Sequence, residues 1–146
     1  MAFVSVTRLR VRSFVYLPRF VVQSLRSARQ AQRSPGFLGG RLMREAGNVF
    51  WTITAWQDDP AMNSYRTQGV HRSVMPRLLV WCDEASVAHW TQELLDVPSW
   101  QEAHRRMVEQ GRPSKVNHPS PAHLARQIPA PRPGRFSGPL RPANSP

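Results

Sequence analysis

The order of apolar and polar residues predicts a strand, a helix and a hairpin in the first part of the chain. Residues 3–12 alternate as a strand does, with its arginines gathered on one face. Residues 16–33 repeat apolar positions every three or four residues, which predicts an amphipathic helix with Pro18 in its first turn. We expect two further strands at 37–44 and 49–56, and the short turn between them predicts an antiparallel hairpin.

The next part of the chain predicts a second helix, a fourth strand and a last helix. Asp-Asp-Pro at 58–60 is typical of a helix start. This helix is weakened at Gly69, and Pro76 is expected to kink it or divide it. A fourth strand is expected at 85–91, and Ser99 has the spacing of a capping box for the last helix.

This order of elements, β-α-β-β-α-β with an extra C-terminal helix, is the ferredoxin-like α+β pattern. The strand at 49–56 is rich in apolar or aromatic residues on both faces, so both faces should be covered. We therefore predict a homodimer that pairs sheet against sheet and closes a dimeric α/β barrel. Phe50, Trp56 and Trp90 would line the interior between the two subunits.

Charge and proline change the picture at the C-terminus. The 146 residues hold 20 Lys and Arg against 9 Asp and Glu, a net charge of +11, and Lys115 is the only lysine. Residues 112–146 hold six of these basic residues, no acidic residue and nine of the 14 prolines. Such a composition predicts disorder, because little apolar surface is available to offset the entropy of ordering. We expect one ferredoxin-like domain at 1–111 and a disordered Pro/Arg-rich tail at 112–146, which either docks on an acidic partner or is simply solvated.

Several classes and compartments are disfavoured by the same counts. No stretch approaches the ~18 apolar residues of a membrane span, so no membrane is expected as a partner. Cys82 is the only cysteine, which excludes an internal disulfide and suits a reducing compartment. The Arg-rich, acid-free start could be a transit peptide, but a strand seems to begin at Phe3. The expected location is therefore cytoplasmic.

Candidate chemistry centres on one histidine. The chain has no phosphate-binding glycine loop and no Gly-x-Ser-x-Gly elbow. No two histidines are spaced i, i+4 as a zinc site on one helical face requires, and no metal is predicted. His71 follows Gly69 in an interrupted helix, where an imidazole could act as a general base or as an axial haem ligand. The structural alternative is that His71 only forms a hydrogen bond to a neighbouring element, and we regard His89 and Cys82 as structural.

The arginine face of the first strand offers a different reading. Arg8, Arg10 and Arg12 alternate beside aromatic residues, an arrangement that can contact phosphates while bases stack. The RNP1-type run of RNA-recognition domains is absent, so nucleic-acid binding through this face is the weaker alternative.

Three motifs carry a resemblance to a known family. They are Trp51-x-Ile53-x-x-Trp56-x-Asp58, Met62-x-x-Tyr65-Arg66 and Gly69-x-His71-Arg72. Over residues 3–113 the chain resembles an uncharacterised family of the dimeric α/β-barrel superfamily, which includes antibiotic-biosynthesis monooxygenases and looks related to spheroidene-monooxygenase-like proteins. The resemblance implies that Tyr65, Arg66, His71 and Arg72 face a cavity between sheet and helices.

From this resemblance we expect a monooxygenase-like protein that binds or acts on a small apolar or aromatic substrate in that cavity. Apolar walls would come from four residues, namely Phe50, Trp56, Met75 and Trp90. His71 would take or relay a proton, and Arg66 or Arg72 would stabilise developing oxyanion charge. The expected cofactor is none, or haem. The alternative is a non-catalytic binding protein whose Arg-rich surface recruits an acidic partner.

Overall fold

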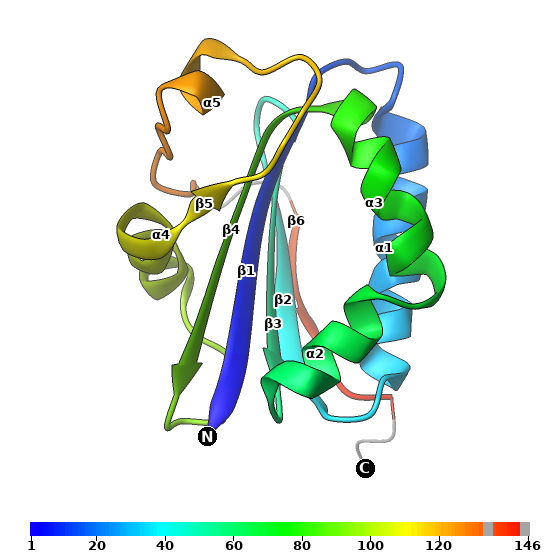
Figure 1. Cartoon of the computed structure of the whole chain (residues 1–146), viewed down its shortest axis with the longest axis vertical. Coiled ribbons are helices and arrows are strands. Elements are labelled where there is room, and N and C mark those ends of the chain that lie inside the picture. Colours follow the sequence, from blue (N-terminus) through cyan, green and yellow to red (C-terminus); the bar gives the residue numbers. More distant parts are fainter. Residues whose placement is uncertain (133–135, 144–146) are drawn as a thin grey trace.

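The computed structural model describes residues 1–132 and 136–143, and these form one six-stranded antiparallel sheet between two layers of helix and loop (Figure 1). The strands are β1 (Ala2–Val11), β2 (Phe37–Glu45), β3 (Val49–Trp56), β4 (Cys82–Gln92), β5 (Arg112–Pro113) and β6 (Phe136–Leu140). The helices are α1 (Leu17–Arg33), α2 (Asp59–Arg66), α3 (Gly69–Trp81), α4 (Trp100–Gln110) and α5 (Pro121–Leu124).

The four central strands lie in the order β4-β1-β3-β2, with β5 and β6 added at the two edges. In the middle of the sheet, Val6 of β1 lies opposite Ile53 of β3 and Ala88 of β4. This arrangement confirms the ferredoxin-like α+β fold class that the order of elements predicts.

One helical layer, made by α1, α2 and α3, covers the first face of the sheet (Figure 1). The helix starts follow the sequence: Pro18 lies in the first turn of α1, and the Asp58 side chain accepts a hydrogen bond from Ala61 N at 2.8 Å. The predicted division at Pro76 is wrong, because Pro76 lies inside α3. The chain instead breaks just before Gly69, whose φ of +58° is a left-handed conformation that favours glycine.

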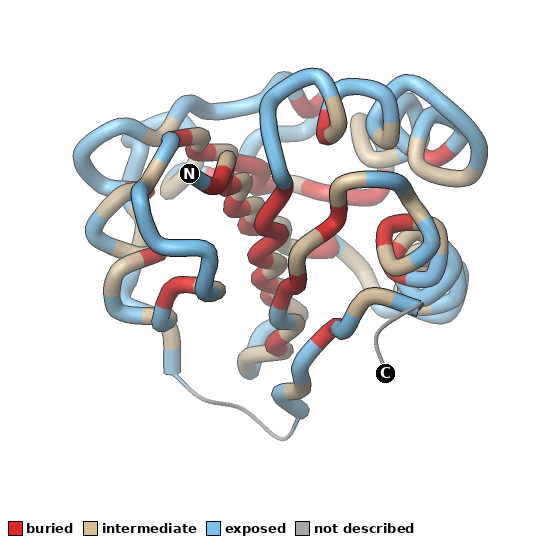
Figure 2. Tube along the Cα trace, turned by 90° about the horizontal axis from the view of Figure 1, so that it is seen from below, coloured by how far each residue is buried: buried red, intermediate tan, exposed pale blue. Residues whose placement is uncertain are grey.

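The second face of the sheet is covered by α4 and by residues that follow it. The apolar cluster on this face is fully or nearly fully buried, and it consists of Val4, Val6, Met43, Val49, Trp51, Ile53, Ala55, Ala88, Trp90, Ala103 and Met107. Figure 2 shows the buried strands at the centre of the molecule, with more exposed chain around them. Helix α4 begins at the predicted cap, where Ser99 Oγ accepts a hydrogen bond from Glu102 N at 3.2 Å.

The arginines of β1 do not form a free phosphate-binding face. Arg8 is buried, and its Nη1 atom donates to Glu84 Oε1 at 2.8 Å. Arg10 Nη1 lies 3.0 Å from the other oxygen of Glu84. Arg12 Nε donates to the Val80 carbonyl at 2.6 Å. The proposed nucleic-acid face is therefore corrected, because two of its three arginines are engaged by one carboxylate and the third by the backbone.

Glu84 holds this ionic cluster together from below the C-terminal segment. Burial alone would raise the pKa of Glu84, but hydrogen bonds from Arg8, Arg10 and Ser120 outweigh it and lower the pKa below its ordinary value. The Ser120 hydroxyl donates to Glu84 Oε2 at 3.0 Å. The carboxylate is therefore charged in the folded protein at neutral pH.

The described residues beyond Gly111 differ from the expected disordered tail. Asn117 N donates to the Leu79 carbonyl at 2.9 Å, and Val116 is buried. Further along, β6 pairs with β2 over five residue pairs, from Gly40 and Leu140 to Arg44 and Phe136. Disorder therefore does not hold for 112–132 and 136–143, because backbone hydrogen bonds to the domain supply what composition does not. Residues 133–135 and 144–146 lie outside the described part of the chain, and independent folding of residues 1–111 stays a prediction.

The predicted lining of a subunit interface is not on one face of the sheet. Phe50 and Trp56 point to the α1–α3 layer, where Phe50 packs on Phe20 with ring centroids 4.6 Å apart. Trp90 lies on the second face, where the Arg106 guanidinium stacks over its ring at 5.0 Å. The structure of the single chain does not show dimerisation, so the homodimer stays a prediction. Within the described residues, no helix is long and apolar enough to cross a membrane.

Replacing Glu84 with glutamine should destabilise the fold strongly. Glu84→Gln leaves the buried Arg8 guanidinium without a counter-charge, and breaking a buried pair in this way typically costs about 3–5 kcal/mol. Urea unfolding followed by circular dichroism measures the loss. The control is Glu109→Gln, which removes a half-exposed pair with Arg105 and should cost less than about 1 kcal/mol. Equal losses in both variants would show that the buried cluster has no special role.

Candidate functional site

A chain of aromatic rings connects the sheet to the junction of α2 and α3. Trp56, at the end of β3, has its ring centroid 5.1 Å from that of Phe37 and 5.0 Å from that of Tyr65. Tyr65, in α2, lies 4.7 Å from the His71 ring at the start of α3. Three of the predicted site residues, Trp56, Tyr65 and His71, are thus brought together by packing. Trp56 is fully buried, and within the described chain its indole N–H has no hydrogen-bond partner.

Gln30 of α1 holds the α2–α3 junction in place. Its side-chain Nε2 donates to the Tyr65 carbonyl at 3.0 Å and to the Gln68 carbonyl at 2.8 Å. Its Oε1 accepts the backbone N–H of His71 at 2.8 Å. The junction leaves backbone groups without helical partners, and one amide side chain satisfies three of them. Sequence reasoning missed Gln30, because its partners lie 35 or more residues away in the chain.

His71 is held in a neutral, proton-accepting form. Burial lowers the pKa of His71 below its ordinary value of 6.5; its contact with the Arg66 carbonyl opposes this shift, and the positive charge of Arg66 adds to it. Nδ1 lies 3.3 Å from the Arg66 carbonyl oxygen, which can only accept. The proton of the neutral ring therefore belongs on Nδ1, and the lone pair on Nε2.

His89 joins this site from the sheet. It lies on β4, half-buried, with its ring 5.5 Å from the ring of Phe3. Burial lowers the pKa of His89, and the charges of Arg66 and Arg112 lower it further. The Arg66 guanidinium therefore acts on both His71 and His89. The sequence offers no signal for this pairing, since 18 residues and a helix separate the two histidines.

Hydroxyl side chains form the floor beside His89. On the helix-facing side of the sheet, Ser5 lies opposite both Thr54 and His89, and Thr7 lies opposite Thr52. In the described part of the chain, none of these four hydroxyls forms a hydrogen bond. A sheet face packed only on apolar helices would not use this composition, because each buried hydroxyl without a partner costs free energy.

The other predicted site residues lie elsewhere. Arg72 and Met75 are exposed on α3, with Met75 44 % exposed. Phe50 lies at the opposite end of β3 from Trp56, and Trp90 lies on the other face of the sheet. The spacing of these residues in the sequence suggested a common wall because it does not distinguish the two ends of a strand or its two faces.

Metal and thiol chemistry receive no support from the geometry. Over residues 1–132 and 136–143, no three His, Cys, Asp or Glu side chains gather as a metal site would require. Burial, with the charge of Asp83, raises the pKa of Cys82 to about 12. Cys82 is therefore a protonated, buried thiol at neutral pH rather than a nucleophile.

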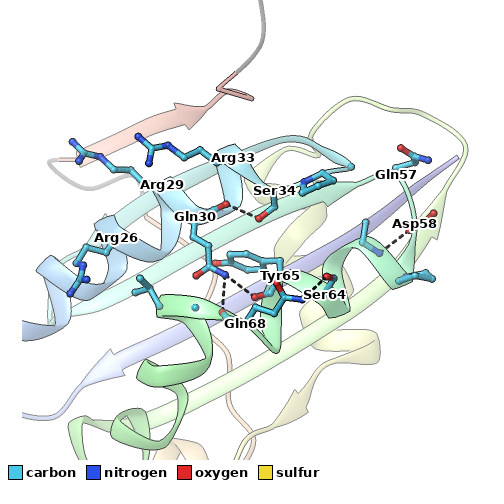
Figure 3. A pocket seen from close by; sticks show the side chains of 16 residues that line it. Arg26, Arg29, Gln30, Arg33, Ser34, Gln57, Asp58, Ser64, Tyr65 and Gln68 are labelled. Carbon is cyan, nitrogen blue, oxygen red and sulfur yellow. Dashed lines mark hydrogen bonds between the residues drawn. The ribbon is translucent and has the colours of Figure 1, made fainter.

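A cleft of about 880 Å³ opens between α1 and the α2–α3 junction (Figure 3). Gln30, Tyr65 and Gln68 lie along its inner side, and three arginines project from α1 along its rim. These arginines are Arg26, Arg29 and Arg33, and all three are exposed. In the described structure, none of them pairs with an acidic side chain, whereas the arginines of β1 and α4 do.

The comparisons with known proteins concern the fold. No family model and no curated protein matches the chain. Among solved structures, it is similar to SnoaB, a cofactor-independent oxygenase from Streptomyces nogalater, with 22 % identity, a TM-score of 0.54 and coverage of 64 % of this chain and 94 % of that one. An antibiotic biosynthesis monooxygenase matches with 12 % identity, a TM-score of 0.56, and 64 % and 100 % coverage. A protein from Mycobacterium tuberculosis matches with 12 % identity, a TM-score of 0.56, and 68 % and 100 % coverage.

These similarities show that the chain has the ferredoxin-like fold of antibiotic-biosynthesis-monooxygenase-like proteins. The resemblance to the dimeric α/β-barrel superfamily is thereby confirmed at the level of the fold. At these identities the similarity does not carry a substrate or a catalytic residue to this chain.

Removing the Gln30 side chain should loosen the site. Gln30→Ala leaves the His71 N–H and two carbonyls without their partner, which should lower the free energy of unfolding by about 1–3 kcal/mol. Chemical denaturation measures the loss. Gln32→Ala is the control on the same helix, because it removes a single exposed hydrogen bond to the Arg141 carbonyl. A Gln30→Ala protein as stable as the control would contradict the role given to this amide.

Proposed function

We propose that the chain is a monooxygenase-like protein that takes a small aromatic substrate between the sheet and the α2–α3 junction. The observation that carries this proposal is a neutral His71 with its lone pair on Nε2, beside the cationic Arg66 and above unpaired hydroxyls of the sheet. The fold shared with named monooxygenases supports the same reading.

The chemistry follows from these groups. His71 Nε2 accepts a proton from an aromatic hydroxyl of the substrate, and the Arg66 guanidinium stabilises the oxyanion that remains. An electron-rich aromatic anion of this kind reacts with dioxygen, and the substrate itself supplies the electrons. Arg66 is preferred over Arg72 for this role, because its charge reaches both histidines.

Tyr65 is assigned to positioning rather than to proton transfer. Its hydroxyl donates to the Ser27 carbonyl at 3.2 Å, and burial raises the pKa of Tyr65 well above its ordinary value. Its ring stacks between Trp56 and His71, so it sets the angle of the imidazole. Of the four predicted apolar wall residues, Trp56 is the one that fits this site, together with Phe3 beside His89.

The cofactor reading follows from the same imidazole. The proposed reaction needs no cofactor, and haem is the alternative. His71 would be its axial ligand, since in the described chain Nε2 has no protein partner while Nδ1 meets a carbonyl. A cytoplasmic location and a homodimer belong to the proposal as well. The single reduced cysteine supports the first, and an apolar second sheet face supports the second.

Substitution of His71 tests the catalytic role. With hydroxynaphthalene and hydroxyanthracene probes, His71→Gln should lower the rate of dioxygen uptake at least about 100-fold, the usual contribution of a general base. The wild-type rate should rise with pH and reach its plateau below pH 6.5, because burial lowers the pKa of His71 and the neutral form is the active one. An oxygen electrode measures both quantities.

The matched control is His118→Gln, which changes an exposed histidine of the C-terminal segment and should leave the rate unchanged. Unchanged turnover in His71→Gln would remove the proposed base. Titration with haem separates the cofactor readings: a Soret band that disappears in His71→Gln supports haem, and an absent band in the wild type removes it.

A second candidate function is the recruitment of an acidic partner through the cleft. The observation that favours it is the row Arg26, Arg29 and Arg33, which lines the cleft and is exposed. Elsewhere in the described chain, Arg8, Arg10, Arg105 and Arg106 are neutralised by carboxylates. This helix therefore carries the positive potential that an acidic protein segment would meet.

Charge removal at the cleft tests this second function. The triple variant Arg26→Gln, Arg29→Gln, Arg33→Gln should weaken binding of a glutamate-rich peptide at least about tenfold at low salt, and salt should weaken the wild-type complex. Fluorescence anisotropy measures the affinity. The control triple Arg19→Gln, Arg41→Gln, Arg112→Gln removes the same charge from exposed positions outside the cleft. Equal weakening in both triples would mean that net charge alone attracts the peptide.

A further inference from the structure

The C-terminal segment, residues 112–143, runs from one edge of the sheet to the other (Figure 1). It begins as β5, where Arg112 pairs with Val87 of β4, and it ends as β6, where Leu140 pairs with Gly40 of β2. Between these edges it passes over the second face, beside α4. The segment is therefore a cover that spans one face and protects both edge strands.

The cover is held by a few separated contacts. Val116 and Leu140 are buried, and half-buried Ile128 packs against the apolar cluster of the second face. Other large apolar side chains of the segment contribute little, since Leu124 is 70 % and Phe136 54 % exposed. A layer attached in this way can leave while the sheet stays folded, because each contact is local and short.

The surface beneath the cover needs another layer. Val4, Val6, Trp51 and Ile53 are all 0 % exposed in the folded chain, and α4 accounts for only part of their covering. An apolar sheet face left in water is unfavourable and seeks a partner. The solved structures named above match 64–68 % of this chain, so the ferredoxin-like unit exists without about a third of it.

We infer that the C-terminal segment is a releasable cover, and that a second copy of this chain replaces it on the second face of the sheet. The occupant is a second copy because the face meets itself well. It is apolar along β1 and β3, and at one end it carries both signs of charge, on Arg8 and Arg10 and on Asp83 and Glu84. Two such faces related by a two-fold axis bring no uncompensated like charges together. The covered chain is a monomer, and the uncovered chain is a dimer.

Release of the cover in the full chain tests this inference. The double variant Val116→Glu, Ile128→Glu puts charge at two anchors, and native mass spectrometry should find mostly dimer where the wild type is monomer. The control, Leu124→Glu with Phe136→Glu, adds the same charge to the same segment at exposed positions and should stay monomeric. A folded release variant that stays monomeric overturns the inference, and so does a wild-type dimer.

Hydrogen exchange of the wild type provides a measurement that needs no substitution. The amides of Ser114, Asn117 and Ser120 donate across the boundary to Ala85, Leu79 and Asp83. They should exchange at least about tenfold faster than the core amides of Val6 and Ile53, because the cover opens without global unfolding. Equal rates would mean that cover and sheet open only together, which overturns the inference. If the double variant does not fold, Ile128→Ser removes one anchor, and its dimer fraction must then exceed that of the wild type at equal concentration.

Discussion

The whole architecture depends on a sheet that cannot face water on either side. Strand β3 carries Trp51, Ile53 and Ala55 on one face and Phe50 and Trp56 on the other, so two layers must cover it. Helices α1 to α3 supply the first layer. The second is assembled from α4 and a proline-rich segment that has little apolar surface of its own. Because the sheet provides most of the buried area, that segment folds against the domain even though its composition favours disorder.

The two faces treat polar groups in opposite ways. On the second face, Arg8 and Glu84 are buried together and satisfy one another, so their charges contribute to the structure and not to binding. On the helix-facing side, Ser5 and Thr52 keep hydroxyls without protein partners next to two neutral imidazoles. Polar atoms that the fold does not use are the ones available to a ligand, and this contrast separates the structural cluster from the candidate site.

The sequence predicts the elements well, because its signals for them are local. Alternation, helical periodicity and the caps at Asp58 and Ser99 place the strands and helices within a few residues of their observed bounds. The candidate site is predicted only in part. His71 and Tyr65 are neighbours along one helical region and were found together, whereas Gln30 and His89 reach the site from distant elements. Arg8 was misassigned because alternation shows which residues share a face but not whether an acid on the neighbouring strand meets them.

One side chain belongs to two places at once. Gln30 lines the arginine cleft, and the same amide accepts the backbone N–H of His71. A molecule in the cleft that takes over this amide must release the first turn of α3, and with it the orientation of the imidazole. Occupancy of the cleft and reactivity of His71 are therefore thermodynamically linked, and the linkage is reciprocal: a substrate that tightens His71 also fixes the wall of the cleft. The α1–α3 seam is thus a short allosteric connection that consists of a single residue.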